Sequence, residues 1–195
     1  MANSVTVNNI VVGGPVSVYV APASTAAPAN TIAKGTDWAG SWVFAGGTMD
    51  GVTFSIQTEK FEVSVDQYNA PVKDFINAQG ITAKFNVAEG TLTNLKQAFG
   101  YGTVTSGSTE STFGIGGADG IGTNYAFGFE CYAPGSTASA SWYRRFIIWN
   151  GSPRQIDDVV MKKDGVMGIG YNVEALIDTT QTASERLIKV IDRVV

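Results

Sequence analysis

The longest alternation of apolar and polar residues, at positions 52–75, changes phase partway along. Because successive side chains of a strand point to opposite faces, a one-residue switch moves the apolar set to the other face. We therefore expect two strand segments that meet at a bulge or tight turn near residues 58–60, with both apolar sets in the core. These sets are Val52, Phe54 and Ile56 on even positions, then Phe61, Val63 and Val65 on odd ones.

Alternation elsewhere also indicates strands. The segment 81–87 places Ile81, Ala83, Phe85 and Val87 on one face and polar residues on the other. The glycine-rich run "GGTMDG" (46–51) is typical of a turn that closes a hairpin. The C-terminal segment 184–195 suits a helix by spacing, but its β-branched residues favour a strand. Further strands are expected at 16–22, 124–134, 139–151, 156–165 and 167–178.

One internal helix is expected, at "TLTNLKQAFG" (91–100). Thr91 suits the N-cap, and Gly100 suits the residue that ends a helix. Leu92, Leu95 and Phe99 recur at helical spacing, which predicts that one side of the helix packs on the protein. The fold class expected is therefore mainly β: two packed antiparallel sheets in a sandwich or barrel-like arrangement, with one short flanking helix and extended loops or arms.

The 195 residues suit a single domain, and the 44% apolar content indicates a folded core. Segments rich in small and polar residues are expected as an N-terminal arm (1–15), long exposed loops (23–37 and 101–123, the latter with room for a short hairpin) and a C-terminal arm (178–195). The N-terminus has no basic region before its short apolar run, and no stretch has the apolar length of a membrane span. We expect synthesis in a cytoplasm and no membrane association.

Composition argues against catalysis. The chain has no histidine and a single cysteine, Cys131, so the usual general base and a cysteine cluster for zinc are both absent. The glycine run at 114–124 lacks the spacing of a phosphate-binding loop. The carboxylate pairs Glu59/Glu62 and Asp157/Asp158 come with no pocket signature, and the basic pairs at 144–145 and 162–163 suit a solvated face or ion pairs between subunits. We expect no enzyme and no cofactor.

Charge and edges point instead to assembly. Only 15% of residues are charged and the net charge is −4, which opposes non-specific DNA binding. Strand edges must be capped, charged or paired, and long arms commonly lie on a neighbour. A self-assembling subunit is therefore favoured. The alternative is a monomeric β-sandwich module that binds carbohydrate or another virion protein, with an exposed platform formed by Trp38, Trp42, Trp142 or Trp149.

Three motifs in order resemble the tail tube protein of long-tailed bacteriophages, a family related to the inner-tube proteins of contractile tails and type VI secretion. They are "GGTMDGVTFSIQTEKFEVSVDQYNAPVKDF" (46–75), "GITAKFNVAEGTLTNLKQAFG" (80–100) and "GVMGIGYNVEALID" (165–178), and the resemblance covers roughly residues 16–192. It implies a structural virion protein whose hexameric rings stack into a tube. Strands of neighbouring subunits would close a β-barrel around the channel.

The same resemblance implies partners, a location in the virion and candidate site residues. The tube would be built around a tape-measure protein, meet terminator and initiator proteins at its ends, and pass double-stranded DNA without binding it specifically. The protein would reside in the virion tail. Candidate channel-facing residues are Glu62, Ser64, Asp66, Lys84 and Asn86, of which Lys84 departs from a purely acidic channel. The candidate contact with the next ring is the loop from Gln67 to Asn77, including Tyr68, Asn69, Pro71, Lys73 and Asp74.

Overall fold

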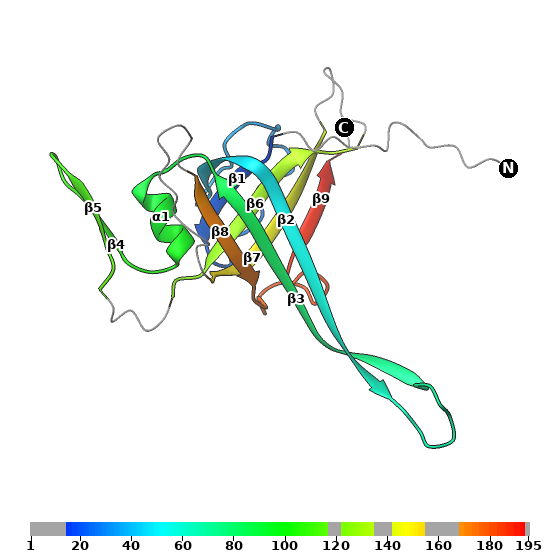
Figure 1. Ribbon diagram of the computed structural model, residues 1–195. Helices are drawn as coiled ribbons and strands as arrows, with labels where there is room; N and C mark the ends of the chain where they lie inside the picture. The colour runs from blue at the N-terminus through cyan, green and yellow to red at the C-terminus, as the bar shows by residue number, and fades with distance from the viewer. Residues whose placement is uncertain (1–14, 117–121, 135–141, 155–167, 194–195) are drawn as a thin grey trace.

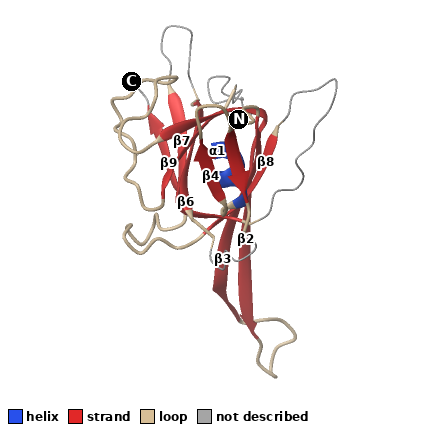
Figure 2. Cartoon of the chain, turned by 90° about the vertical axis from the view of Figure 1, so that its left-hand side faces the viewer, coloured by secondary structure: helices blue, strands red, loops and turns tan. Residues whose placement is uncertain are grey.

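The computed structural model describes residues 15–116, 122–134, 142–154 and 168–193. Within them the expected mainly β fold with one short helix is confirmed (Figures 1 and 2). The predicted strand at 156–165 and nearly all of the arm at 1–15 lie outside the described residues. The elements are β1 (Ser17–Pro22), β2 (Val43–Val63), β3 (Lys73–Val87), α1 (Leu92–Phe99), β4 (Thr103–Ser106), β5 (Ser111–Gly114), β6 (Tyr125–Tyr132), β7 (Tyr143–Pro153), β8 (Ile169–Ala175) and β9 (Lys189–Arg193).

Seven strands form one antiparallel sheet in the order β6-β1-β2-β3-β8-β7-β9. Because β6 also pairs with β7, the sheet closes on itself and the two expected sheets are opposite walls of one barrel. Its interior is filled by aromatic and branched side chains. Phe85 stacks on Tyr171 with ring centroids 4.7 Å apart and meets Phe129 edge-on at 5.0 Å. These contacts bury the alternating apolar residues of β3 as the sequence predicts.

The helix α1 begins and ends as expected. The Thr91 side chain accepts a hydrogen bond from the Asn94 backbone N–H at 3.1 Å, and Gly100 adopts a left-handed conformation with φ of 74°. Leu95 and Phe99 pack against the barrel core. Asn94 is buried and donates from its side chain to the carbonyls of Ala45 and Glu89, which ties the helix to β2.

The prediction that "GGTMDG" closes a hairpin is wrong, because β2 runs without a turn from Val43 to Val63. Its glycines are accommodated within the strand. Gly46 and Gly51 have positive φ angles of 135° and 80°, and the pairing with β3 shifts register between Thr48 and Val52. A glycine-rich run can produce a bulge in a continuous strand as well as a turn, and the long-range partners of the strand decide between them.

The remaining loops and the C-terminus are now placed. Residues 103–114 contain the short β4–β5 hairpin, and the final strand β9 pairs with β7, as the β-branched residues favour. Residues 23–37 form a loop, as expected. Together with the residues that follow it up to Trp42, this loop also covers the outer side of the barrel. Trp38 and Trp42 pack there with Tyr19 and Trp149 in a second apolar cluster outside the barrel.

Candidate functional site: a projecting hairpin and a polar sheet face

The distal halves of β2 and β3 form a hairpin that projects well beyond the barrel (Figure 1). Ile56 and Phe61, both expected in the core, are 72% and 62% exposed, and Val65 is also exposed, so the prediction is wrong for these three residues in the single subunit. Only Val63 of the second apolar set is partly covered. The barrel ends before the hairpin does, which leaves no core for these side chains. The large apolar residues exposed on the hairpin are Ile56, Phe61, Val65, Tyr68, Val72, Phe75 and Ile76.

A bulge lies where the phase switch predicts it. Glu59 pairs with Ala78 and Lys60 with Ile76, so Asn77 is the extra residue on β3. Counted along β2 by alternation, Phe61 then falls on the opposite face from Phe54, whose ring packs in the barrel. The switch therefore moves the apolar face of the hairpin from the barrel side to the other side.

The turn of the hairpin is shorter than the predicted contact loop. Val63 pairs with Lys73, and the Val72 N–H donates to the Val63 carbonyl at 2.8 Å, so the turn comprises residues 64–72. All nine of its residues are exposed. Of the candidate contact residues, four lie in the turn and three on β3: Gln67, Tyr68, Asn69 and Pro71, then Lys73, Asp74 and Asn77.

The predicted channel residues divide between two places. Ser64 and Asp66 lie in the turn and Glu62 near the end of β2, whereas Lys84 and Asn86 lie on the part of β3 that belongs to the barrel. All five are exposed. Because Lys84 pairs with Thr53 in the register, alternation along β2 puts Glu62 and Lys84 on opposite faces of the ribbon. The structure therefore does not gather them on one face.

Charges on the hairpin partly compensate one another. Glu62 lies directly opposite Asp74 in the strand register. The Lys60 ammonium, on the same face, donates a hydrogen bond to the Asp74 carboxylate at 2.7 Å. That hydrogen bond lowers the pKa of Asp74 and raises the pKa of Lys60. Lys73, on the opposite face, lies 4.7 Å from the centroid of the Phe75 ring. One face thus carries a cluster of charges, while the other combines the rings of Phe61 and Phe75 with Lys73 and, by the same alternation, Glu59.

The outer face of the barrel wall formed by β2, β3 and β8 is polar. It holds a shallow groove of about 420 Å³ lined by hydroxyl and amide side chains together with Lys84 and an ion pair between Arg154 and Glu174. The hydroxyl and amide residues are Ser55, Gln57, Thr82 and Asn172. This face carries little net charge, so it offers no strong attraction to phosphates and no strong repulsion of them.

Both edges of the projecting hairpin are open. Among the described residues, β2 beyond Thr48 pairs with β3 alone, and β3 before Ile81 pairs with β2 alone. Unpaired strand edges are templates for pairing with another chain. The hairpin therefore offers edges and apolar side chains together.

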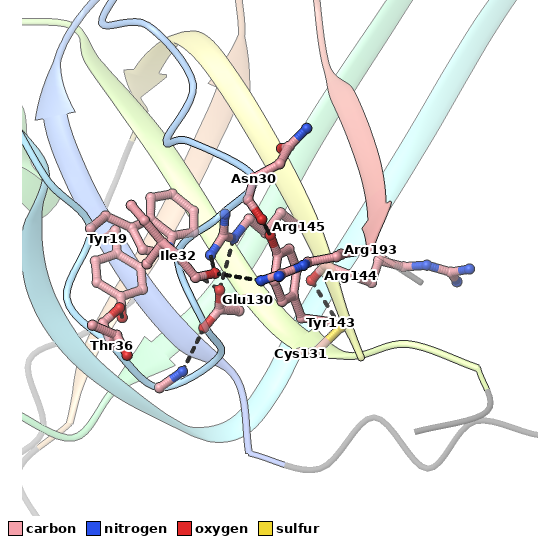
Figure 3. A network of polar contacts seen from close by, with 12 residues as sticks. Tyr19, Asn30, Ile32, Thr36, Glu130, Cys131, Tyr143, Arg144, Arg145 and Arg193 are labelled. Carbon is pink, nitrogen blue, oxygen red and sulfur yellow. Dashed lines mark hydrogen bonds and ion pairs between the residues drawn. The ribbon is translucent and has the colours of Figure 1, made fainter. Parts of the chain in front are cut away.

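A buried ion pair that was not anticipated from the sequence lies between β6 and β7 (Figure 3). Glu130 and Arg145 face each other across β6 and β7, are fully buried, and meet at 2.8 Å. Arg145 also donates to the carbonyls of Ala29 and Ile32 at 3.2 and 3.0 Å, and Glu130 accepts from the Gly35 N–H at 3.0 Å. The pair holds the 23–37 loop and has no open access, so it is a structural element and not a catalytic one.

The basic pair at 144–145 was expected on a solvated face or between subunits, and that prediction is wrong for Arg145. Arg145 is buried, and Arg144 makes two hydrogen bonds of 2.6 Å to Asp192 within the same chain. This bond lowers the pKa of Asp192. The sequence signal that could have located the buried pair is the opposition of one acid and one base at facing positions of two adjacent apolar strands.

The tryptophans do not form the platform that a carbohydrate-binding module would need. Trp38, Trp42 and Trp149 are between 2% and 6% exposed, and Trp142 is half-buried. Within the described part of the chain, no group of three or more histidine, cysteine, aspartate or glutamate side chains is placed to hold a metal ion. None of the helices in those residues is both long and apolar enough to cross a membrane.

Comparison with known proteins identifies one family. A family model described as phage tail tube protein matches residues 3–192. No curated protein matches the chain.

Proposed function

Because the chain belongs to the phage tail tube protein family, a structural component of phage tails, we propose that its copies form hexameric rings that stack into the conduit for the genome. The observation that carries the proposal is the projecting β2–β3 hairpin, which has two open edges and seven exposed large apolar residues. In a single subunit these edges and apolar side chains remain exposed to solvent. A ring in which neighbours pair along these edges would cover them.

The channel wall is assigned to the polar face of β2, β3 and β8. Lys84 and Asn86 would line it. Glu62 and Asp66 of the projecting hairpin would bring carboxylates, and Ser64 a hydroxyl, to the channel where one ring meets the next. A wall of neutral hydroxyl and amide groups with few charges suits the passage of DNA, since strong contacts to phosphates would retain it.

The turn and the start of β3 are assigned to the contact with the next ring. Tyr68 is 67% exposed, and with Gln67, Asn69, Pro71, Lys73, Asp74 and Asn77 it lies at the end of the element that projects furthest from the barrel. The tape-measure protein inside the tube and the proteins that begin and end it are the expected partners. The protein would be made in the host cytoplasm and incorporated into the virion tail.

Electron microscopy of the purified full-length protein tests this function. We expect rings with six-fold symmetry and hollow tubes, and sedimentation should show species far larger than the 20.5 kDa subunit. A matched variant in which residues 58–79 are replaced by Asn-Gly keeps Gln57 opposite Gly80, so it should keep the barrel and remain monomeric, because it lacks the projecting surface. A full-length protein that stays monomeric at high concentration in every salt tested would refute the proposal.

A further inference from the structure

The short β4–β5 hairpin is a second element that stands off the barrel, beyond α1 (Figure 1). Among the described residues, β4 and β5 pair only with each other, so both outer edges of this hairpin are open. Aromatic contacts hold its base, where the ring centroid of Phe99 lies 5.8 Å from that of Tyr101 and 5.7 Å from that of Phe113. Because an isolated two-stranded hairpin is marginally stable in water, a second surface packed on it would stabilise it.

The β4–β5 hairpin presents one apolar side chain and one carboxylate to solvent. Ile115, directly after β5, is 49% exposed. Glu110 is exposed at the turn, and no described residue forms an ion pair with it. The turn itself is closed by the backbone of Glu110, whose carbonyl accepts from the Gly107 N–H at 2.8 Å, so the carboxylate is not used within the hairpin turn.

A groove of about 710 Å³ lies between the base of the β2–β3 hairpin and the segment that leads from β8 to β9. Apolar side chains line both of its walls: Ile56, Ile76 and Ile81 on one side, and Ile177, Leu187 and Ile188 on the other. Ile56 and Ile177 are 72% and 62% exposed, so the groove leaves large apolar surfaces in contact with water. We name it the β8–β9 groove.

The β8–β9 groove and the β4–β5 hairpin face different neighbours. In Figure 1 the hairpin extends to the left of the barrel, whereas β9 and the segment before it lie on the right. The groove also borders the part of β2 that pairs with β3 alone, which is an open edge. A copy placed beside the first one would therefore bring its hairpin to the groove side.

Charges complement each other at the two surfaces. Arg186 is the only charged residue among the described residues that line the groove. Its side chain is exposed, and no described carboxylate lies within ion-pair distance of it. The groove thus combines apolar walls with one unpaired cation, while the hairpin combines an apolar side chain with one unpaired anion.

We propose that the β4–β5 hairpin of one copy docks in the β8–β9 groove of the neighbouring copy in the same ring. Ile115 packs against Ile177 and Leu187 of the neighbour, and Glu110 pairs with Arg186. Because the two surfaces differ and lie on opposite sides of the subunit, the contact is heterologous and closes a ring when it repeats around an axis. This inference rests on the proposed function and adds a contact within the ring that is separate from the projecting β2–β3 hairpin.

A charge exchange tests the contact in the full-length protein. Glu110→Arg and Arg186→Glu should each require about tenfold more protein to form rings, as measured by sedimentation, because each places like charges at the contact. The chain that carries both exchanges should assemble like the wild type. Asp37→Arg is the matched control: Asp37 is an exposed acid of the loop on the outer side of the barrel, so its reversal should leave assembly unchanged.

The outcomes separate this inference from the proposed function. If the wild type forms neither rings nor tubes, the proposed function fails. If it forms them and the single exchanges assemble normally, or if the double exchange does not restore assembly, the docking assignment is overturned and the function stands.

A disulfide trap provides a second readout that does not depend on reversed charges. With Cys131 replaced by serine, cysteines at Ile115 and Ile177 should form disulfides between copies upon oxidation of assembled rings. The expected result on a denaturing gel is a series of covalent multimers that ends at the subunit number of one ring. Exclusive monomer would overturn the assignment, and so would a series that continues beyond one ring, because the contact would then run between rings. Cysteines at Ile115 and Asp37 are the control and should leave the protein monomeric on the gel; equal cross-linking of this pair would also overturn the assignment.

Discussion

Removing the guanidinium of the buried ion pair should destabilise the subunit strongly. Arg145 is fully buried, bonds to Glu130 at 2.8 Å, and its guanidinium carbon lies 3.9 Å from the centroid of the Tyr143 ring. Arg145→Ala leaves a buried carboxylate without its counter-charge and removes two hydrogen bonds to the carbonyls of the 23–37 loop. Loss of one partner of a buried pair costs about 3–5 kcal/mol in the free energy of unfolding.

The neighbouring arginine gives the matched control. The side chains of Arg144 and Asp192 are 33% and 37% exposed, and pairs of this kind contribute only about 0–1 kcal/mol because solvent screens them. Arg144→Ala should therefore lower the free energy of unfolding far less than Arg145→Ala, although the two residues are adjacent and of the same type.

Urea unfolding followed by tryptophan fluorescence measures the difference, at protein concentrations below those of assembly. Three buried tryptophans report on the region, and Trp38 lies directly beside the pair, donating to Glu130 at 3.3 Å. For a chain of this size, about 3–5 kcal/mol corresponds to a decrease in Tm of roughly 6–20 °C. If Arg145→Ala costs no more than Arg144→Ala, the reasoning about the buried pair is refuted. Replacing Glu130 and Arg145 together by leucine and methionine should recover part of the loss.

Other perturbations have distinct expected results. The Arg144 hydrogen bond lowers the pKa of Asp192, so its contribution is present above the unfolded pKa of about 3.9 and is lost as pH falls through the lower folded value. Arg144→Ala should therefore flatten the loss of stability with acid in urea midpoints measured between about pH 2 and 5, and an unchanged slope would contradict this. Gly128→Ala would place a methyl group in steric overlap with the ring of Trp38, and it should cost about 1–3 kcal/mol in unfolding free energy and shift the fluorescence maximum. Wild-type stability of this variant would show that the ring moves freely. Phe61→Ser should leave subunit Tm within about 1 °C, because its side chain is 62% exposed, yet reduce tube formation seen by light scattering; a large loss of Tm would place Phe61 in a core.

Local signals in the sequence predicted local structure well. The caps of α1 depend on Thr91 and Gly100 alone, and the bulge near Glu59 follows from the alternation of the strand itself. The outward direction of Lys84 and Asn86 follows from the buried residues between and beside them. Each of these features is decided by residues that are neighbours in the chain.

Features that depend on distant partners were not predictable in this way. Whether residues 46–51 turn or continue depends on pairing with β1 and β3, which the run itself does not encode. The exposure of Phe61 depends on where the barrel ends, and alternation says which side a residue faces but not whether anything covers that side. The Glu130–Arg145 pair required the β6–β7 register to be known.

A cryo-electron microscopy reconstruction of tubes assembled from the full-length protein tests the central claim most directly. The account predicts that the β2–β3 hairpin lies between successive rings, that its open edges are paired with neighbouring copies, and that Lys84 and Asn86 face the channel. A tube in which the hairpin is free in solvent on the outer surface, with the polar face of β3 directed away from the channel, would contradict it.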